Sequence, residues 1–237
     1  MMGLFRPSGG VIFHLRAWRQ QRLWQPFNVA IAQWLESWEV PREELILVGP
    51  SGGYTLPQNW LRSFRQIHAY DTDPLAAWMF GKRHPFARAK FHRTDVFWKE
   101  GRLSLSPLKK MLKEHPKASV AFCNLLGQLP LEGEFNEHQW EIYLNELRLL
   151  MKDRHWASYH DLATIEPLPL DRHQIVLNEY ANSDGKDLKR ALGGMRKKNV
   201  MITDHLMRGR WTADLEKRLF AWSLTPKSLH VIEGVRA

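Results

Sequence analysis

Short apolar runs alternate with amphipathic stretches through the middle of this 237-residue chain. Five runs are expected to be strands: 45–48, 67–70, 91–97, 118–123 and 155–159. The stretches between them carry apolar residues at helical spacing, most clearly from Ser106 to Leu112 and over 138–151. Alternating buried strands and helices are typical of parallel strands joined by crossover helices. The pattern predicts an α/β fold with a doubly wound, mostly parallel sheet of the seven-stranded type.

The two ends of the chain depart from this alternation. Residues 219–224 and 229–233 are apolar runs joined by four residues, too few for anything but an antiparallel hairpin. Near the N-terminus, an apolar stripe from Phe27 to Trp38 predicts a helix that starts just after Pro26. We therefore expect an N-terminal helical lid at 1–41, a Rossmann-like α/β core at 42–160, and a less regular region with the closing hairpin of the same domain at 161–237.

Composition limits the setting and the partners. Cys123 is the only cysteine, which excludes an internal disulfide and indicates a reducing, cytoplasmic location. No run approaches the roughly 20 apolar residues of a membrane span. The formal charge of +9, with basic runs at 82–93 and 186–198, favours RNA or another polyanion as a partner. The eleven histidines show no short metal-ligand spacing, so no metal is expected.

The turn after the first strand, Gly49-Pro50-Ser51-Gly52-Gly53, admits three interpretations. A phosphate-binding loop would need a lysine where Thr55 stands. A G-x-S-x-G elbow would make Ser51 an esterase nucleophile, with His205 or His230 as its base, but too few residues precede it for that architecture.

The third interpretation is a nucleoside-binding turn in which Gly49, Ser51 and Gly53 bring the backbone close to a ligand. Asp71 follows Gly49 by 22 residues, just past the second strand, where its carboxylate can accept from ribose hydroxyls. Asp95, near the end of the third strand, lies where it can accept from an adenine amino group. The two other interpretations predict neither acid.

This arrangement resembles the class I S-adenosylmethionine-dependent methyltransferases, over about 42–160 and the terminal hairpin. Residues 45–53 are similar to the family's glycine motif, and Phe122-Cys123-Asn124-Leu125-Leu126 to its fourth-strand active-site motif. The resemblance implies S-adenosylmethionine as cofactor, S-adenosylhomocysteine as product and an unknown methyl acceptor. Two residues depart from the pattern: Leu47 replaces the usual acid before the first glycine, and Ser51 replaces the middle glycine.

Few side chains are needed for the chemistry, because methyl transfer is an in-line displacement that requires a base only when the acceptor must lose a proton. Asn124 is expected to orient the acceptor, and His160, beside Asp161, to act as the base. Five of the eleven tryptophans, Trp78 among them, fall on apolar stripes, whereas Trp98 and Trp211 fit no stripe and are expected to face a ligand. A non-catalytic methyltransferase-like binding protein and the Ser51 esterase remain as alternatives.

Overall fold

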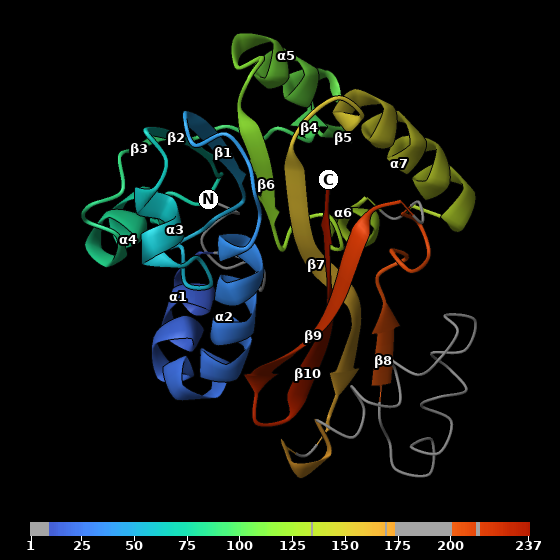
Figure 1. Cartoon of the computed structure of the whole chain (residues 1–237). Coiled ribbons are helices and arrows are strands. Elements are labelled where there is room, and N and C mark those ends of the chain that lie inside the picture. The colour runs from blue at the N-terminus through green and yellow to red at the C-terminus, as the bar shows by residue number, and fades with distance from the viewer. Residues whose placement is uncertain (1–9, 134, 169, 174–200, 212–213) are drawn as a thin grey trace.

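A mixed sheet of eight strands forms the centre of the protein in the computed structural model, which describes residues 10–133, 135–168, 170–173, 201–211 and 214–237 (Figure 1). Seven strands follow the order β3-β2-β1-β6-β7-β10-β9, and β8 pairs with β7. The strands are β1 (Glu44–Val48), β2 (Gln66–Tyr70), β3 (Ala89–His92), β6 (Ser119–Cys123), β7 (Trp156–Glu166), β8 (Met201–Asp204), β9 (Glu216–Thr225) and β10 (Ser228–Arg236). A separate two-stranded sheet joins β4 (Trp98–Lys99) to β5 (Arg102–Leu103).

The pairing directions confirm the predicted fold class. β1, β2, β3, β6 and β7 pair in parallel, whereas β10 is antiparallel to both β7 and β9. The chain lays down β1, β2 and β3 in one direction across the sheet and then returns to place β6 on the other side of β1. The strand order therefore reverses between β1 and β6, where open α/β sheets bind their ligands.

Helices cover both faces of the sheet. One face carries α1 (Gly10–Arg19), α2 (Gln21–Glu36), α3 (Gln58–Arg62) and α4 (Ala76–Arg83), and the other carries α5 (Ser106–Glu114), α6 (Leu129–Glu132) and α7 (Glu137–Met151). A 3-10 turn spans Leu170–Arg172. In Figure 1 the blue α1 and α2 and the green to olive α5 and α7 lie on opposite sides of the strands.

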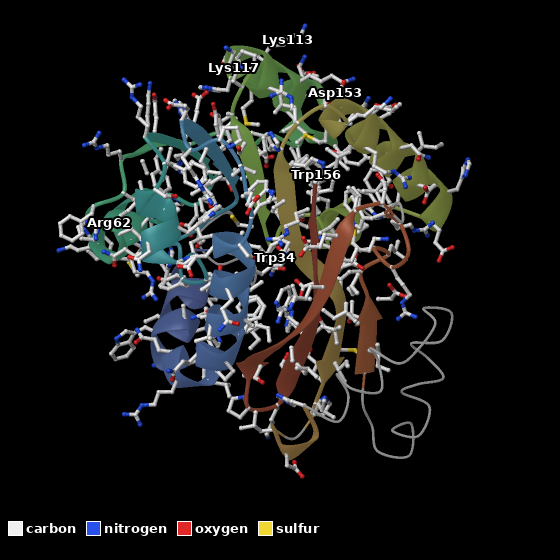
Figure 2. The ribbon with its side chains drawn as sticks, in the orientation of Figure 1. Trp34, Arg62, Lys113, Lys117, Asp153 and Trp156 are labelled. Atoms are coloured by element: carbon white, nitrogen blue, oxygen red, sulfur yellow. The ribbon has the colours of Figure 1, made fainter. Side chains whose placement is uncertain are left out.

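The N-terminal stripe packs directly on the sheet. Phe27 of α2 stacks on Trp222 of β9 at 5.0 Å, and Trp34 meets Phe220 edge to face at 6.0 Å. Figure 2 shows Trp34 in the interior between these elements. Burying such aromatic rings stabilises the fold by a few kcal/mol each, at about 25 cal/mol per Å² of apolar surface, so α2 is part of the core layer.

Three element boundaries and one side chain differ from expectation. α2 begins at Gln21 and contains Pro26, because the buried apolar stripe extends back to Trp24. β3 ends at His92, so Asp95 follows the strand by three residues. β7 continues to Glu166, well past the expected end at Tyr159, because β10 and β8 pair with its second half. Trp78 is 61% exposed on α4 rather than buried. None of the helices in the described part of the chain is long and apolar enough to cross a membrane.

Candidate functional site

A cleft of about 870 Å³ opens at the carboxyl ends of the parallel strands, where the strand order reverses. Five of the predicted site residues line it: Gly49, Ser51, Asp71, Asp95 and Asn124. The structure thus brings together residues that are up to 75 positions apart in the sequence. The volume lies within the range of roughly 300–1,000 Å³ that holds small ligands and cofactors.

Three residues of the glycine turn have positive φ angles, which residues with a side chain rarely adopt. Gly49 and Gly53 have φ values of +68° and +67°, and Ser51 has a φ of +48°. A Cβ on Gly53 would lie 2.7 Å from His84 Nε2, so Gly53 is held against α4 and does not line the cleft. Its role is to shape the turn, whereas Gly49 and Ser51 face the ligand space. Leu47, at the position where the resembled family carries an acid, is fully buried in the apolar core.

Asp71 connects the end of β2 to this turn. One of its carboxylate oxygens accepts from the Ser51 backbone N–H at 2.7 Å, and the other accepts from the Asp73 N–H at 2.9 Å. Burial raises the pKa of the Asp71 carboxyl to about 6, although these two hydrogen bonds lower it. Each carboxylate oxygen can accept more than one hydrogen bond, so Asp71 keeps capacity for a donor on a ligand.

Asp95 is positioned by the loop after β3. Its Oδ1 accepts from the backbone N–H groups of Phe97 and Trp98, at 2.9 and 3.1 Å. The carboxylate is therefore fixed in the lining of the same cleft as Asp71. Trp98 lines the cleft, in accord with expectation. Trp211 does not, because its ring is buried against Trp156.

His160 does not line the cleft, and the structure corrects its assignment as the base. It lies inside β7, on the face opposite to Tyr159 and Asp161, because alternate residues of a strand point to opposite faces. The side chain is 0% exposed; its Nδ1 contacts the Ser158 hydroxyl at 2.9 Å, and its Nε2 accepts from Trp211 at 3.3 Å. Both ring nitrogens are thus occupied within the core.

A different histidine faces the cleft beside a carboxylate. His230 of β10 contacts Asp161 Oδ1 through Nδ1 at 2.6 Å, and both residues line the cleft. Burial opposes ionisation of Asp161, but the charge and hydrogen bond of His230, with further help from His205 and Asn124, hold the pKa of this carboxyl below its usual range. Within the described residues, the hydrogen bonds of His230 use Nδ1 alone. Asp161 therefore fixes the ring so that Nε2 carries the basic lone pair.

His205 and Thr164 complete this wall of the cleft. His205 donates from Nδ1 to the Gly127 carbonyl at 2.7 Å, and its Nε2 accepts from the Thr164 hydroxyl at 2.9 Å. Gly127 lies so close to β7 that a Cβ would be 2.3 Å from the Asp161 carbonyl oxygen. The close approach places the loop after β6 against β7 and so brings Asn124 to Asp161.

Two buried polar atoms in the cleft have no protein partner within the described ranges: Ser51 Oγ and Asn124 Oδ1. The Asn124 amide forms a side-chain hydrogen bond to Asp161, which leaves its oxygen unpaired. An unsatisfied buried polar atom carries a penalty of about 1–3 kcal/mol, so such atoms in a cleft indicate a ligand or water that pairs with them.

The first helix borders the same cleft. Gly10, Phe13 and Arg16 of α1 line it. Asp73 Oδ2 accepts from the Gly10 N–H at 2.9 Å and lies 2.9 Å from His14 Nε2, while His14 Nδ1 contacts the Tyr54 hydroxyl at 2.8 Å. α1 is therefore tied to the turns after both β1 and β2.

Comparisons with known proteins find similar structures but no similar sequences. No protein-family model and no curated protein matches this chain. A solved DhpI complex with S-adenosylhomocysteine is 12% identical, with a TM-score of 0.43, over 98% of this chain and 97% of that one. An S-adenosylmethionine-dependent methyltransferase from Anabaena variabilis is 17% identical, with a TM-score of 0.42, over 93% and 94%. The 23S rRNA methyltransferase ErmE is 13% identical, with a TM-score of 0.40, over 88% and 67%. Because these sequence identities and TM-scores are low, the functional interpretation rests on the residues of the cleft and not on the structural similarity.

The structure also bears on two further sequence-based hypotheses and on one pairing that was not predicted. Ser51 Oγ has no hydrogen-bond partner among the described residues, and His205 and His230 are bonded to Thr164, Gly127 and Asp161 instead. The geometry therefore does not support the esterase. The basic run 186–198 lies outside the described residues. The pairing of His230 with Asp161 was not predicted, because the two residues lie 69 positions apart on different strands. The only signal in the sequence was the acid Asp161, which lies where polar residues interrupt an apolar run.

Proposed function

We propose that the protein is an S-adenosylmethionine-dependent methyltransferase with an acceptor still to be identified. The proposal rests chiefly on one observation: the glycine turn, Asp71, Asp95 and Asn124 border one cleft at the point where the strand order reverses. A nucleoside cofactor needs hydrogen-bond acceptors for its ribose and base at these places.

The charge of the cleft fits this cofactor better than it fits a phosphorylated one. Acidic side chains predominate in its lining: Asp71, Asp73, Asp95, Glu132, Asp161 and Glu166. Among the residues that the structure describes, Arg16 is the only arginine or lysine that lines it. Phosphate groups would be repelled here, whereas a nucleoside with a sulfonium and an ammonium group would be attracted. We propose that Arg16 pairs with the carboxylate of the cofactor. The acidic lining would bind the cofactor's ammonium group, which the apolar Leu47 cannot bind.

Each residue of the cleft would have its own role in binding the cofactor or positioning the acceptor. Gly49 and Ser51 bring the backbone and the unpaired Ser51 Oγ to the cofactor, Asp71 accepts from the ribose hydroxyls, and Asp95 accepts from the adenine amino group. When bound, S-adenosylmethionine supplies an electrophilic methyl group on a sulfonium. The Asn124 Oδ1 would then orient an acceptor N–H or O–H in line with that methyl group.

His230 would receive the proton of an acceptor that must lose one. Asp161 holds Nδ1–H of His230, so Nε2 accepts the proton, and the ionised carboxylate stabilises the resulting imidazolium. This arrangement assigns to His230 the role that the sequence suggested for His160. The wall formed by buried His205 and half-buried Thr164 would limit the access of water to the same place.

An exposed surface on α3 and α4 supports a polyanionic acceptor or partner. The Arg62 guanidinium lies over the Phe86 ring at 5.2 Å, and Lys82 Nζ lies 5.9 Å from the Trp78 ring. Phe86 and Trp78 are 65% and 61% exposed. Cations beside exposed aromatic faces suit the phosphates and bases of single-stranded RNA. The single, fully buried Cys123 is compatible with the proposed cytoplasmic setting.

Calorimetric titration with S-adenosylmethionine and S-adenosylhomocysteine tests the proposal. The wild type is expected to bind both, and Asp71→Asn is expected to bind roughly 10–100-fold more weakly, because charge-assisted hydrogen bonds to the ribose are lost. Asp153→Asn is the matched control, since Asp153 is exposed beyond α7 and far from the cleft (Figure 2). No binding by the wild type at millimolar ligand would favour the non-catalytic binding protein.

A further inference from the structure

Three side chains that the sequence leaves far apart meet on one face of the sheet. Glu44 is the first residue of β1, His68 lies within β2, and His115 follows the last turn of α5. Glu44 Oε1 is 2.7 Å from His115 Nδ1 and 3.2 Å from His68 Nε2. One oxygen and two imidazole nitrogens thus converge within 4.8 Å of one another, and none of the three residues lines the cleft.

Each of the two imidazoles also has a partner for the ring nitrogen that points away from Glu44. His115 Nε2 contacts the Tyr70 hydroxyl at 3.2 Å, and His68 Nδ1 contacts His92 Nε2 at 3.0 Å. Without an ion, His115 donates from Nδ1 to Glu44 at 2.7 Å. An ion would replace this proton, and with the protons on the outward nitrogens, His115 Nδ1 and His68 Nε2 would both present lone pairs to the ion. Histidines that bind metals are commonly fixed in this way by a hydrogen bond from the other ring nitrogen.

The three side chains are largely shielded from solvent. His68 is buried, and the side chains of Glu44 and His115 are 24% and 14% exposed, so the cluster is enclosed but open to an ion from solvent.

We propose that Glu44, His68 and His115 form a binding site for a divalent transition-metal ion, with Zn²⁺ as the preferred ion. Two imidazoles and one carboxylate are a zinc ligand set, with bonds of about 2.0–2.2 Å. Tetrahedral bonds of that length separate ligand atoms by roughly 3.3 Å. The 3.2 Å separation between Glu44 Oε1 and His68 Nε2 already fits this distance. The 2.7 Å separation between Glu44 Oε1 and His115 Nδ1 would have to lengthen by roughly half an ångström.

The fourth position falls beside Gln66, whose side-chain amide is 2.7 Å from His68 Nε2. Amide oxygen and nitrogen are interchanged by a flip, so Gln66 or a water completes the coordination. The ion joins the start of β1, the middle of β2 and the end of α5. At this position the ion would stabilise the fold. It would take no part in the cofactor binding proposed for the glycine turn or in the proton transfer proposed for the Asp161–His230 pair.

The test uses the full chain, stripped with chelator and titrated with Co²⁺, which reports four-coordinate geometry by its visible absorption, and with Zn²⁺ by calorimetry. The expected result is one ion per chain and a melting temperature raised by Zn²⁺, because the ion binds only the folded state. In His115→Gln and in the more conservative Glu44→Gln, affinity is expected to fall by more than the roughly 10–100-fold that the loss of an outer-shell partner brings.

Two control variants locate the ion. His138→Gln removes an exposed histidine of α7, and His230→Gln removes the cleft histidine; both are expected to keep the wild-type affinity. The proposal is overturned when the wild type binds no ion at unit stoichiometry, when Glu44→Gln and His115→Gln both retain affinity within tenfold, or when binding is lost in His230→Gln. Should His115→Gln fail to fold by circular dichroism, Glu44→Gln alone decides.

Discussion

At the scale of single residues, Asp71 shows how the fold prepares a carboxylate for the neutral hydroxyl groups of a ribose. Burial raises the pKa of Asp71 to about 6, yet two backbone N–H groups hold its oxygens at the entrance of the glycine turn. Ionisation of this group is therefore less favourable than for an exposed aspartate, and a further hydrogen-bond donor favours it. A ribose diol offers two such donors, so binding and ionisation reinforce each other.

This coupling predicts a pH dependence of cofactor binding. Because donors on the ligand favour the carboxylate, the pKa of Asp71 falls on binding; affinity is full above about pH 6 and declines as the pH falls through that value. Titration with S-adenosylhomocysteine at about pH 5 to pH 7.5, in buffers of different ionisation enthalpy, is expected to show a proton released near pH 6. In Asp71→Asn that proton release should disappear. Proton uptake by the wild type would contradict the assignment.

At the scale of elements, α1 depends on one acidic side chain for its attachment beside the cleft. Asp73 accepts from the Gly10 N–H and lies 2.9 Å from His14, and it also accepts from the Leu75 N–H at the start of α4. Burial opposes its ionisation, but these bonds hold the pKa of Asp73 below its usual value. The stabilisation is therefore present at every pH above about 4 and is lost only as the pH falls through the folded value.

Asp73→Ala is accordingly expected to loosen α1. The loss of several buried hydrogen bonds is expected to lower the free energy of unfolding by about 1–3 kcal/mol. Hydrogen exchange of the α1 amides should accelerate, and cofactor affinity should fall because Gly10, Phe13 and Arg16 line the cleft. Asp153→Ala provides the control on an exposed carboxylate. Unchanged exchange in α1 would mean that other contacts hold the helix.

Elements with a regular apolar pattern could be predicted from the sequence, and their exceptions have physical causes. β1, β2 and β6 are continuous apolar runs and were predicted almost to the residue. The predicted β7 was too short, because the polar residues His160 and Asp161 suggested the end of the strand although both are buried. Without the full strand, the sequence could not show which of its residues face the cleft. Partners such as Asp161 and His230 are brought together only by strand pairing, which leaves no motif in the sequence.

At the scale of the whole molecule, the charge is unevenly arranged. The formal charge is +9, yet acids predominate in the lining of the cleft. The excess of basic residues therefore lies on other surfaces, and α3 and α4 combine some of it with exposed rings. A cationic cofactor and a polyanionic partner would thus be drawn to different parts of the protein.

This arrangement predicts that single-stranded RNA binds over α3 and α4 with a strong salt dependence. The double variant Arg62→Glu with Lys82→Glu is expected to weaken binding and to lower the slope of log affinity against log salt by roughly 1–2, because about two phosphate contacts are lost. Lys113→Glu with Lys117→Glu makes the same change in net charge at α5, on the other side of the sheet, and should leave the slope almost unchanged (Figure 2). Filter binding across a salt series measures both. Equal losses in the two double variants would show that the net charge alone attracts RNA, and the aromatic surface on α4 would then have no special role.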